Sequence, residues 1–187
     1  MADDTFALTG AEVLLPGGVF GLRTVCIDRG VITAVLPADA NISFPFFDIS
    51  GHYLSPGFVD IHVNGGGGAS FEEATDDAIK TVLQTGVRYG TTSAVGAINT
   101  ATREDRLSQL EALSRFENIA GCAEFLGAHL EGPYYSLAQR GAHNPDWIRL
   151  PDPDEYSRWV DRFSDLIRVV TFAPELEGGL DLVKALS

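Results

Sequence analysis

Strands and helices alternate along the last two thirds of this sequence, and this alternation restricts the possible folds more than any other feature. Strand-like apolar segments occur at 58–65, 91–98, 125–131 and 167–172, and helical apolar spacing occurs at 76–89, 102–116, from 152 and from 179. A strand–helix–strand order implies parallel strands joined by crossover helices. We therefore predict an α/β fold for residues 56–187.

The number of strand–helix units suggests half of a larger architecture. Residues 58–187 supply four such units, whereas a complete (β/α)8 TIM-type barrel has eight in about 250 residues. An open four-stranded sheet leaves an unpaired edge, and the last helical segment has no stop signal before Ser187. We predict the first half of a (β/α)8 barrel in an apparently truncated chain.

Residues 1–55 have a different pattern, typical of a small β layer. Short β-branched runs lie on either side of Asp28-Arg29-Gly30, which is a hairpin signal. The segment 39–48 lacks clean alternation and is predicted to be a connecting loop. We place a domain boundary near Pro56, with residues 1–55 and 56–187 as the two domains.

Composition excludes several classes of function. A formal net charge of -13 argues against a nucleic-acid partner, since proteins that bind nucleic acid present a basic face. The N-terminus lacks a signal peptide, and no apolar run is long enough to span a membrane. Cys26 and Cys122 form no paired motif, so neither a disulfide framework nor a thiolate metal site is indicated. These features predict a cytoplasmic protein without a membrane partner.

Two of the predicted strands end in possible metal ligands. His129 and Glu131 end the strand at 125–131, and His62 and Asn64 lie two residues apart at the end of the first. Imidazole and carboxylate groups bind zinc and similar divalent ions, and polar groups at strand ends are typical of catalytic sites in barrels. A hydrogen-bonded structural role remains the alternative for each histidine.

Two loops near these strand ends are candidates for substrate contact. The polar loop 140–145 follows the predicted metal site, and its Ala142 backbone and His143 ring could hold a polar substrate. An ordinary surface loop is the alternative. The glycine run 65–68 could cradle a phosphate, but it lacks the Lys-Ser/Thr ending of a P-loop. We predict a flexible connection there.

Four motifs in order resemble the N-acetylglucosamine-6-phosphate deacetylases of the amidohydrolase superfamily. They are Pro56-Gly57-Phe58-Val59-Asp60-Ile61-His62-Val63-Asn64-Gly65, His129-Leu130-Glu131-Gly132-Pro133, Gly141-Ala142-His143-Asn144-Pro145 and Thr171-Phe172-Ala173-Pro174-Glu175. The resemblance covers nearly the whole chain. It also implies that residues 1–55 form the N-terminal part of an accessory β-sandwich.

The resemblance implies a metal-dependent hydrolase that converts N-acetylglucosamine 6-phosphate to glucosamine 6-phosphate and acetate. Glu131 matches the principal metal-binding carboxylate, and His62 and Asn64 match a variable metal-binding pair. Ala142 matches a backbone contact to substrate, with His143 beside it. The implied metal is zinc, with iron and manganese as alternatives. The resemblance also implies that further metal ligands and the general acid/base lie beyond Ser187, and that the full-length protein is a homodimer acting on a small amino-sugar phosphate.

Two other interpretations stay open from the sequence. The chain could belong to an amidohydrolase that cleaves a different carbon–nitrogen bond, or it could be a non-catalytic half-barrel. Because the resemblance implies that the general acid/base lies beyond Ser187, we predict that these 187 residues are inactive alone.

Overall fold

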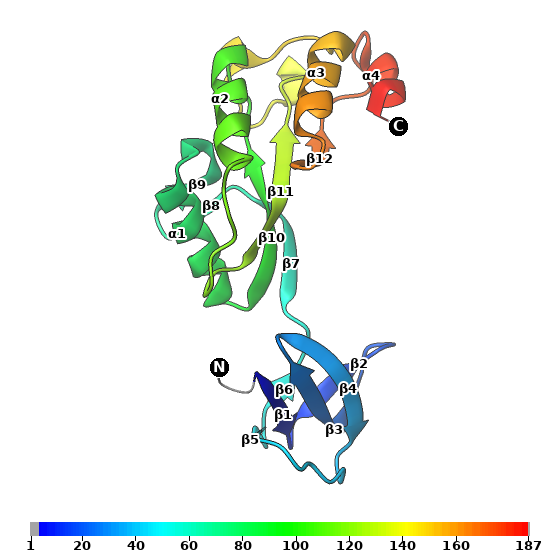
Figure 1. Cartoon of the computed structure of the whole chain (residues 1–187). Helices are drawn as coiled ribbons and strands as arrows, with labels where there is room; N and C mark the ends of the chain where they lie inside the picture. Colours follow the sequence, from blue (N-terminus) through cyan, green and yellow to red (C-terminus); the bar gives the residue numbers. More distant parts are fainter. Residues whose placement is uncertain (1–3, 187) are drawn as a thin grey trace. The chain divides into compact units, whose positions relative to one another are not determined.

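The computed structural model describes residues 4–186, and the chain divides into two compact units between Pro56 and Gly57 (Figure 1). The first unit is a six-stranded sheet made of β1 (Thr5–Thr9), β2 (Glu12–Leu15), β3 (Val19–Asp28), β4 (Val31–Pro37), β5 (Phe46–Asp48) and β6 (Tyr53–Leu54). The long β3 pairs antiparallel with β1, β2 and β4. It is therefore the central strand of this unit.

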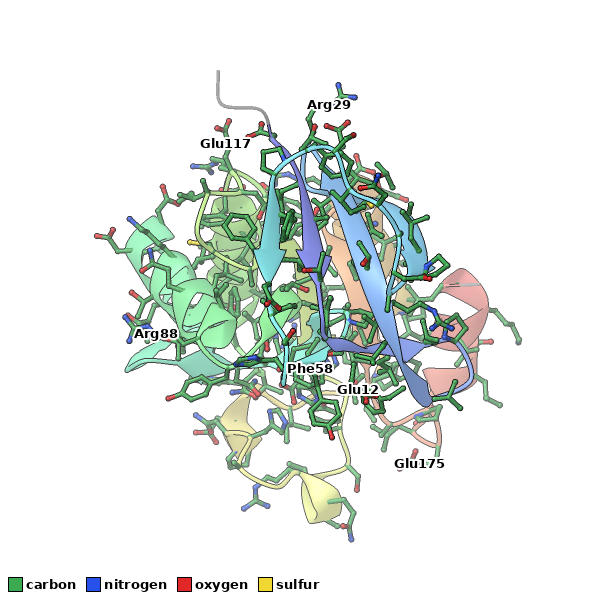
Figure 2. All side chains as sticks on the ribbon, turned by 90° about the horizontal axis from the view of Figure 1, so that it is seen from below. Glu12, Arg29, Phe58, Arg88, Glu117 and Glu175 are labelled. Carbon is green, nitrogen blue, oxygen red and sulfur yellow. The ribbon has the colours of Figure 1, made fainter. Side chains whose placement is uncertain are left out.

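The predicted hairpin between β3 and β4 is confirmed. Arg29 and Gly30 form its two-residue turn, and both have positive φ, 48° and 78°. A two-residue turn with this conformation matches the right-handed twist of the two strands that it joins. The side chain of Arg29 extends into solvent from this turn (Figure 2). By contrast, the prediction of a loop throughout 39–48 was wrong, since Phe46–Asp48 is a strand parallel to β1. Its aromatic Phe47 packs edge-on against Phe6, with ring centroids 5.6 Å apart.

The second unit is built on a parallel sheet with the order β12-β11-β10-β7. Its strands are β7 (Phe58–Val63), β10 (Thr91–Ile98), β11 (Glu124–Glu131) and β12 (Ile167–Thr171). Its helices are α1 (Asp76–Val87), α2 (Arg103–Leu113), α3 (Pro153–Phe163) and α4 (Gly179–Leu186), with short 3-10 turns at Phe71–Glu73, Leu137–Gln139 and Pro145–Trp147. Strand order follows chain order, so α1, α2 and α3 each connect neighbouring parallel strands, and α4 follows β12.

Local sequence signals explain where these helices begin. The hydroxyl of Thr102 accepts a hydrogen bond from the Asp105 N–H at the start of α2, and the carboxylate of Asp152 accepts one from Glu155 N–H at the start of α3. Both residues are N-caps, which satisfy amide groups that the first helical turn leaves unpaired. The predicted starts of α2 and α3 are thus confirmed. None of the helices within residues 4–186 has the length and apolar content to cross a bilayer.

The core of the second unit lies between its helices and the parallel sheet. Its largest fully buried apolar members are Phe71, Ile79, Leu83, Ile98, Leu110, Leu113, Leu130, Tyr134, Tyr156 and Leu182. The ring of Phe71 stacks on Phe125, with centroids 5.6 Å apart. This packing joins the segment after β7 to β11, and so to the strand that carries Glu131.

The glycine run after β7 is more ordered than predicted. Gly65–Gly66 (β8) pairs antiparallel with Ala69–Ser70 (β9), and Gly67 and Gly68 form the turn with φ values of 65° and 87°. Positive φ at consecutive positions favours glycine because it has no Cβ. The prediction of a flexible connection was therefore wrong, and the run is a short hairpin.

Packing of Phe71 over Gly96 leads to a stability prediction. A Cβ at position 96 would lie 2.5 Å from the Phe71 ring, which is fully buried and has no room to turn away. We expect Gly96→Ala to lower the free energy of unfolding by about 1–3 kcal/mol, the usual cost of overpacking a core. Urea denaturation measures this, with Thr92→Ala on the exposed face of the same strand as the control, expected to cost below about 1 kcal/mol. Equal costs for the two variants would contradict the packing argument.

Candidate active site

Glu131 is the last residue of β11, and the end of β7 brings two polar side chains to its carboxylate. Its Oε1 accepts a hydrogen bond from Asn64 Nδ2 at 2.7 Å and lies 3.0 Å from His62 Nε2. Parallel pairing of β7, β10 and β11 places the carboxyl ends of these strands at one edge of the sheet. The structure therefore brings together Glu131, His62 and Asn64, which the sequence predicted as metal ligands.

The environment of Glu131 favours its ionised form. Burial by itself disfavours the charge, but the hydrogen bonds from Asn64 and His62 outweigh it, and the pKa of Glu131 lies below its ordinary value. Asp60 does not join this group, because its carboxylate accepts the backbone N–H of His62 at 3.0 Å. Glu131 is thus a buried carboxylate that remains charged at neutral pH.

His129 lies beside His62 and is held from the opposite side by β12. Their rings meet edge to face with centroids 4.5 Å apart, and His129 Nε2 lies 2.7 Å from Thr171 Oγ1. Burial lowers the pKa of His129, and the neighbouring His62 lowers it further. These effects favour a neutral imidazole whose Nε2 is already occupied by a hydroxyl.

The loop that follows Glu131 returns His143 to the same carboxylate. His143 Nε2 lies 3.8 Å from Glu131 Oε2, and its Nδ1 lies 3.3 Å from Thr100 Oγ1. Its ring also packs on Tyr135, with centroids 4.6 Å apart. Ala142 lies next to it at the exposed turn, and its N–H has no acceptor within the described chain. Both predicted substrate contacts therefore lie on a loop anchored at the site, with one free amide.

Gly132 shapes the start of this loop. Its φ is 71°, and a Cβ there would lie 2.8 Å from the methyl group of Thr100. A side chain at this position would be strained by the backbone and would also clash with a residue that contacts His143. The backbone conformation and the close approach of Thr100 therefore explain why glycine occupies this position.

Arg106 is a site residue that the sequence analysis missed. It is 1% exposed, and its guanidinium donates to the carbonyls of Ile98 at 3.2 Å, of Asn99, and of Glu131 at 3.5 Å. Burial lowers its pKa to about 10, so it keeps its charge at neutral pH. Arg106 thus ties the ends of β10 and β11 together. Its position one helical turn before Leu110, on the buried face of α2, is the feature of the sequence that could have indicated its burial.

The donor set around Glu131 meets part of what a divalent metal requires. Carboxylate and imidazole are the oxygen and nitrogen ligands that zinc prefers, and a catalytic site generally uses three protein ligands and one open position. Among residues 4–186, no three His, Cys, Asp or Glu side chains are arranged as a metal site. Glu131 and His62 therefore supply one oxygen and one nitrogen donor, fewer than such a site uses.

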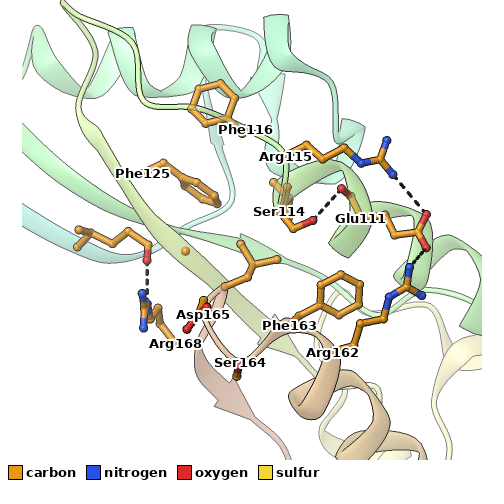
Figure 3. Close-up of a pocket in the computed structure, with 14 residues that line it drawn as sticks. Glu111, Ser114, Arg115, Phe116, Phe125, Arg162, Phe163, Ser164, Asp165 and Arg168 are labelled. Atoms are coloured by element: carbon orange, nitrogen blue, oxygen red, sulfur yellow. Dashed lines mark hydrogen bonds and ion pairs between the residues drawn. The ribbon is translucent and has the colours of Figure 1, made fainter.

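A separate pocket of about 570 Å³ lies at the amino ends of β11 and β12, away from Glu131 (Figure 3). Two of its arginines already pair with one carboxylate, since Arg162 and Arg115 lie 2.6 and 3.5 Å from Glu111 oxygens. A third, Arg168, donates to the Leu126 carbonyl. The three arginines of this pocket are therefore engaged within the protein. The polar groups around Glu131 lie at the opposite ends of the strands.

Comparison with known proteins identifies the family. The sequence model described as "Amidohydrolase family" matches residues 53–179, which include β7 to β12 and the whole Glu131 site. The chain belongs to the amidohydrolase family. This family assignment agrees with the resemblance found in the sequence.

Several relatives of this amidohydrolase are named as deacetylases of amino-sugar phosphates. N-acetylglucosamine-6-phosphate deacetylase of Haemophilus influenzae is 31% identical over 96% of this chain and 48% of its own length, and the human protein of that name is 33% identical over 75% and 36%. A Mycobacterium smegmatis deacetylase structure, a D267A mutant in complex with N-acetyl-D-glucosamine-6-phosphate, has a TM-score of 0.81 at 32% identity over 98% of this chain and 47% of that one. The chain spans about half the length of these proteins, and it shares their α/β fold.

The contact between His129 and Thr171 gives the first prediction for this site. Thr171→Val keeps the shape of the side chain but leaves the buried Nε2 of His129 without its partner. We expect a loss of about 1–3 kcal/mol in the free energy of unfolding, the cost of an unpaired buried polar group. Thr171→Ser keeps the hydroxyl and serves as the control in the same urea titration. A serine variant as destabilised as the valine variant would contradict this role.

The lowered pKa of Glu131 predicts a dependence of stability on pH. Because the pKa is lower in the folded protein than in the unfolded chain, the ionised carboxylate stabilises the fold above the unfolded value near 4.5, and this contribution disappears as pH falls through the folded pKa. Urea unfolding with a chelator at several pH values between about 3 and 7 compares the chain with Glu131→Gln. We expect the difference to favour the unmodified chain increasingly as pH rises, and a constant difference would contradict it.

Proposed function

We propose that the protein carrying this chain hydrolyses the acetamide bond of N-acetylglucosamine 6-phosphate, releasing acetate and glucosamine 6-phosphate. The observation that carries the proposal is the buried, ionised Glu131, which Asn64 and His62 hold at the end of a parallel strand. Relatives named as deacetylases of this substrate align over the same region. The reaction fits a site that combines a charged carboxylate, imidazoles and a free backbone amide.

We propose that residues 56–187 form the first four strand–helix units of a (β/α)8 barrel and that residues 1–55 form part of an accessory β-sandwich. Sequential parallel strands with connecting helices support this architecture. So does the position of β7 at one edge of the sheet, where Phe58 and Ile61 are 66% and 61% exposed. An edge strand leaves backbone N–H and C=O groups unpaired, and a further strand would pair with them.

We propose that Glu131, His62 and Asn64 take part in holding a divalent metal, which is zinc, iron or manganese. The metal supplies Lewis-acid activation of water and of the amide carbonyl when it is bound. In this chain, Glu131 provides a carboxylate that stays charged, and Asn64 and His62 orient it. The remaining ligands and the general acid/base are proposed to lie beyond Ser187.

The substrate contacts are proposed to come from the loop after β11. Ala142 offers its free N–H to a sugar oxygen, and the His143 ring lies within 3.8 Å of the Glu131 carboxylate. Its contact with Thr100 fixes the ring's position. We propose that the full-length protein is cytoplasmic and acts as a homodimer on this small amino-sugar phosphate.

Acetate release by the native protein is the direct test. We expect turnover of N-acetylglucosamine 6-phosphate, its loss on metal removal by a chelator, and a decrease of at least about 100-fold in kcat/KM for Glu131→Gln, equivalent to about 2.7 kcal/mol of transition-state stabilisation. Glu111→Gln changes a carboxylate at the opposite ends of the strands and should retain activity. For the 187-residue chain alone we expect no turnover.

The remaining interpretations are separate outcomes of the same assay. Turnover of another amide with none of this substrate would assign the site to a different amidohydrolase reaction. Native protein that hydrolyses no amide with metal supplied would favour a non-catalytic half-barrel. Activity that survives Glu131→Gln unchanged would remove Glu131 from the metal site and contradict the proposal.

A further inference from the structure

Both ends of the loop that carries His143 are tied to one buried carboxylate, that of Glu155 near the start of α3. Glu155 is 4% exposed, and its two oxygens accept four hydrogen bonds from three side chains. Tyr134, which begins the loop, donates to Oε2 at 2.7 Å. Arg149, near the loop's end, donates to Oε2 at 3.1 Å and to Oε1 at 2.8 Å. These bonds close the neck of the loop.

Further contacts hold the same neck. The Arg149 N–H donates to the Pro133 carbonyl at 3.2 Å, and Tyr134 also donates to the Asp152 carbonyl at 3.2 Å. Arg103 from α2 completes the carboxylate's partners with a bond of 2.8 Å to Oε1. The beginning of the loop, its end and two helices therefore converge on Glu155, which has no contact with Glu131 or His143 of its own.

The chemistry of this cluster makes it a rigid support. Arginine can hold both oxygens of a carboxylate through its planar fork, and a buried carboxylate needs every such donor because its charge is shielded from water. Burial raises the pKa of Tyr134, and its bond to Glu155 raises it further, so the hydroxyl stays a donor. The tip of the loop at residues 137–142 is exposed, in contrast to the buried neck.

We infer that Glu155 is a positioning residue that holds the loop 134–149 so that His143 stays beside the Glu131 carboxylate and keeps the neighbouring Ala142 amide near the site. The inference rests on the proposed function, since it assumes that these two groups contact substrate. Its structural part is independent of that assumption. Without the closed neck, the contacts of His143 with Thr100 and Tyr135 would have to hold the loop by themselves.

The test uses NMR on the 187-residue chain with Glu155→Gln, which keeps the side-chain shape but removes the charge. We expect the amides of His143 and Arg149 to exchange with solvent at least about tenfold faster, because their acceptors lie within the loop and its neck. Nuclear Overhauser contacts between the His143 ring and Thr100 should be lost, while amides of β10 and β11 stay protected. A general loss of stability would not produce this selective pattern.

Two further variants make the result decisive. Glu111→Gln is the matched control, since Glu111 is also a carboxylate paired with two arginines but lies outside the loop, and it should leave the loop unchanged. If Glu155→Gln does not fold, Tyr134→Phe decides, because it removes only one donor at the neck and two bonds. Unchanged loop exchange and an intact contact of His143 with Thr100 in a folded neck variant would overturn the inference.

Adding N-acetylglucosamine 6-phosphate separates this inference from the proposed function. We expect the Ala142 and His143 amide signals to shift in the unmodified full-length protein with zinc present, and to shift less in the full-length Glu155→Gln variant at the same ligand concentration. If the unmodified full-length protein shows no response but the loop still loosens in Glu155→Gln, the ligand assignment fails and the loop-holding role of Glu155 stands. A ligand response equal in both full-length proteins would overturn the positioning role.

Discussion

Parallel pairing of β7, β10 and β11 is the constraint on which the rest of the second unit depends. In a parallel sheet the carboxyl ends of neighbouring strands meet at one edge, so residues far apart in sequence become neighbours there. Asn64 and Glu131 are 67 positions apart, yet their side chains lie 2.7 Å from one another. A shift in the register of β7 against β10 would separate this pair and leave the buried carboxylate without a donor.

Buried carboxylates constrain the structure around the carboxyl ends of these strands. Glu131 is compensated by Asn64 and His62 on its side chain, while the guanidinium of Arg106 contacts its backbone carbonyl. On α3, Glu155 is compensated by two arginines and a tyrosine. Because an uncompensated buried charge costs several kcal/mol, each carboxylate requires its own partners in place. The two clusters thus restrain the strand ends and the loop that follows Glu131.

Several parts of the fold were predictable because their signals are local. The N-caps at Thr102 and Asp152 act on amides within three residues, and the turn at Arg29 and Gly30 depends only on backbone conformation. Where partners are distant, prediction was less successful. Phe46–Asp48 forms a strand because β1 is available to pair with it, and nothing within 39–48 contains that information.

The candidate site shows the same division. The apolar run ending in Glu131, the His62 and Asn64 pair and the polar loop at 140–145 could all be recognised from residue type and spacing. The supporting residues could not, since Thr100, Thr171 and Glu155 are ordinary polar residues until their partners are known. Glu155 lies in the first turn of α3, and its side chain binds Arg103, Arg149 and Tyr134.

The sequence by itself determined the alternation of strands and helices, the strand ends that carry the polar groups and the family to which the chain belongs, because these depend on short-range periodicity and contiguous motifs. Only the tertiary structure decided which polar groups meet. The contacts of His143 with Thr100, of His129 with Thr171 and of Arg106 with three carbonyls arise from strand register and helix packing. Such contacts join residues through space, and the one-dimensional order of the chain carries no direct record of them.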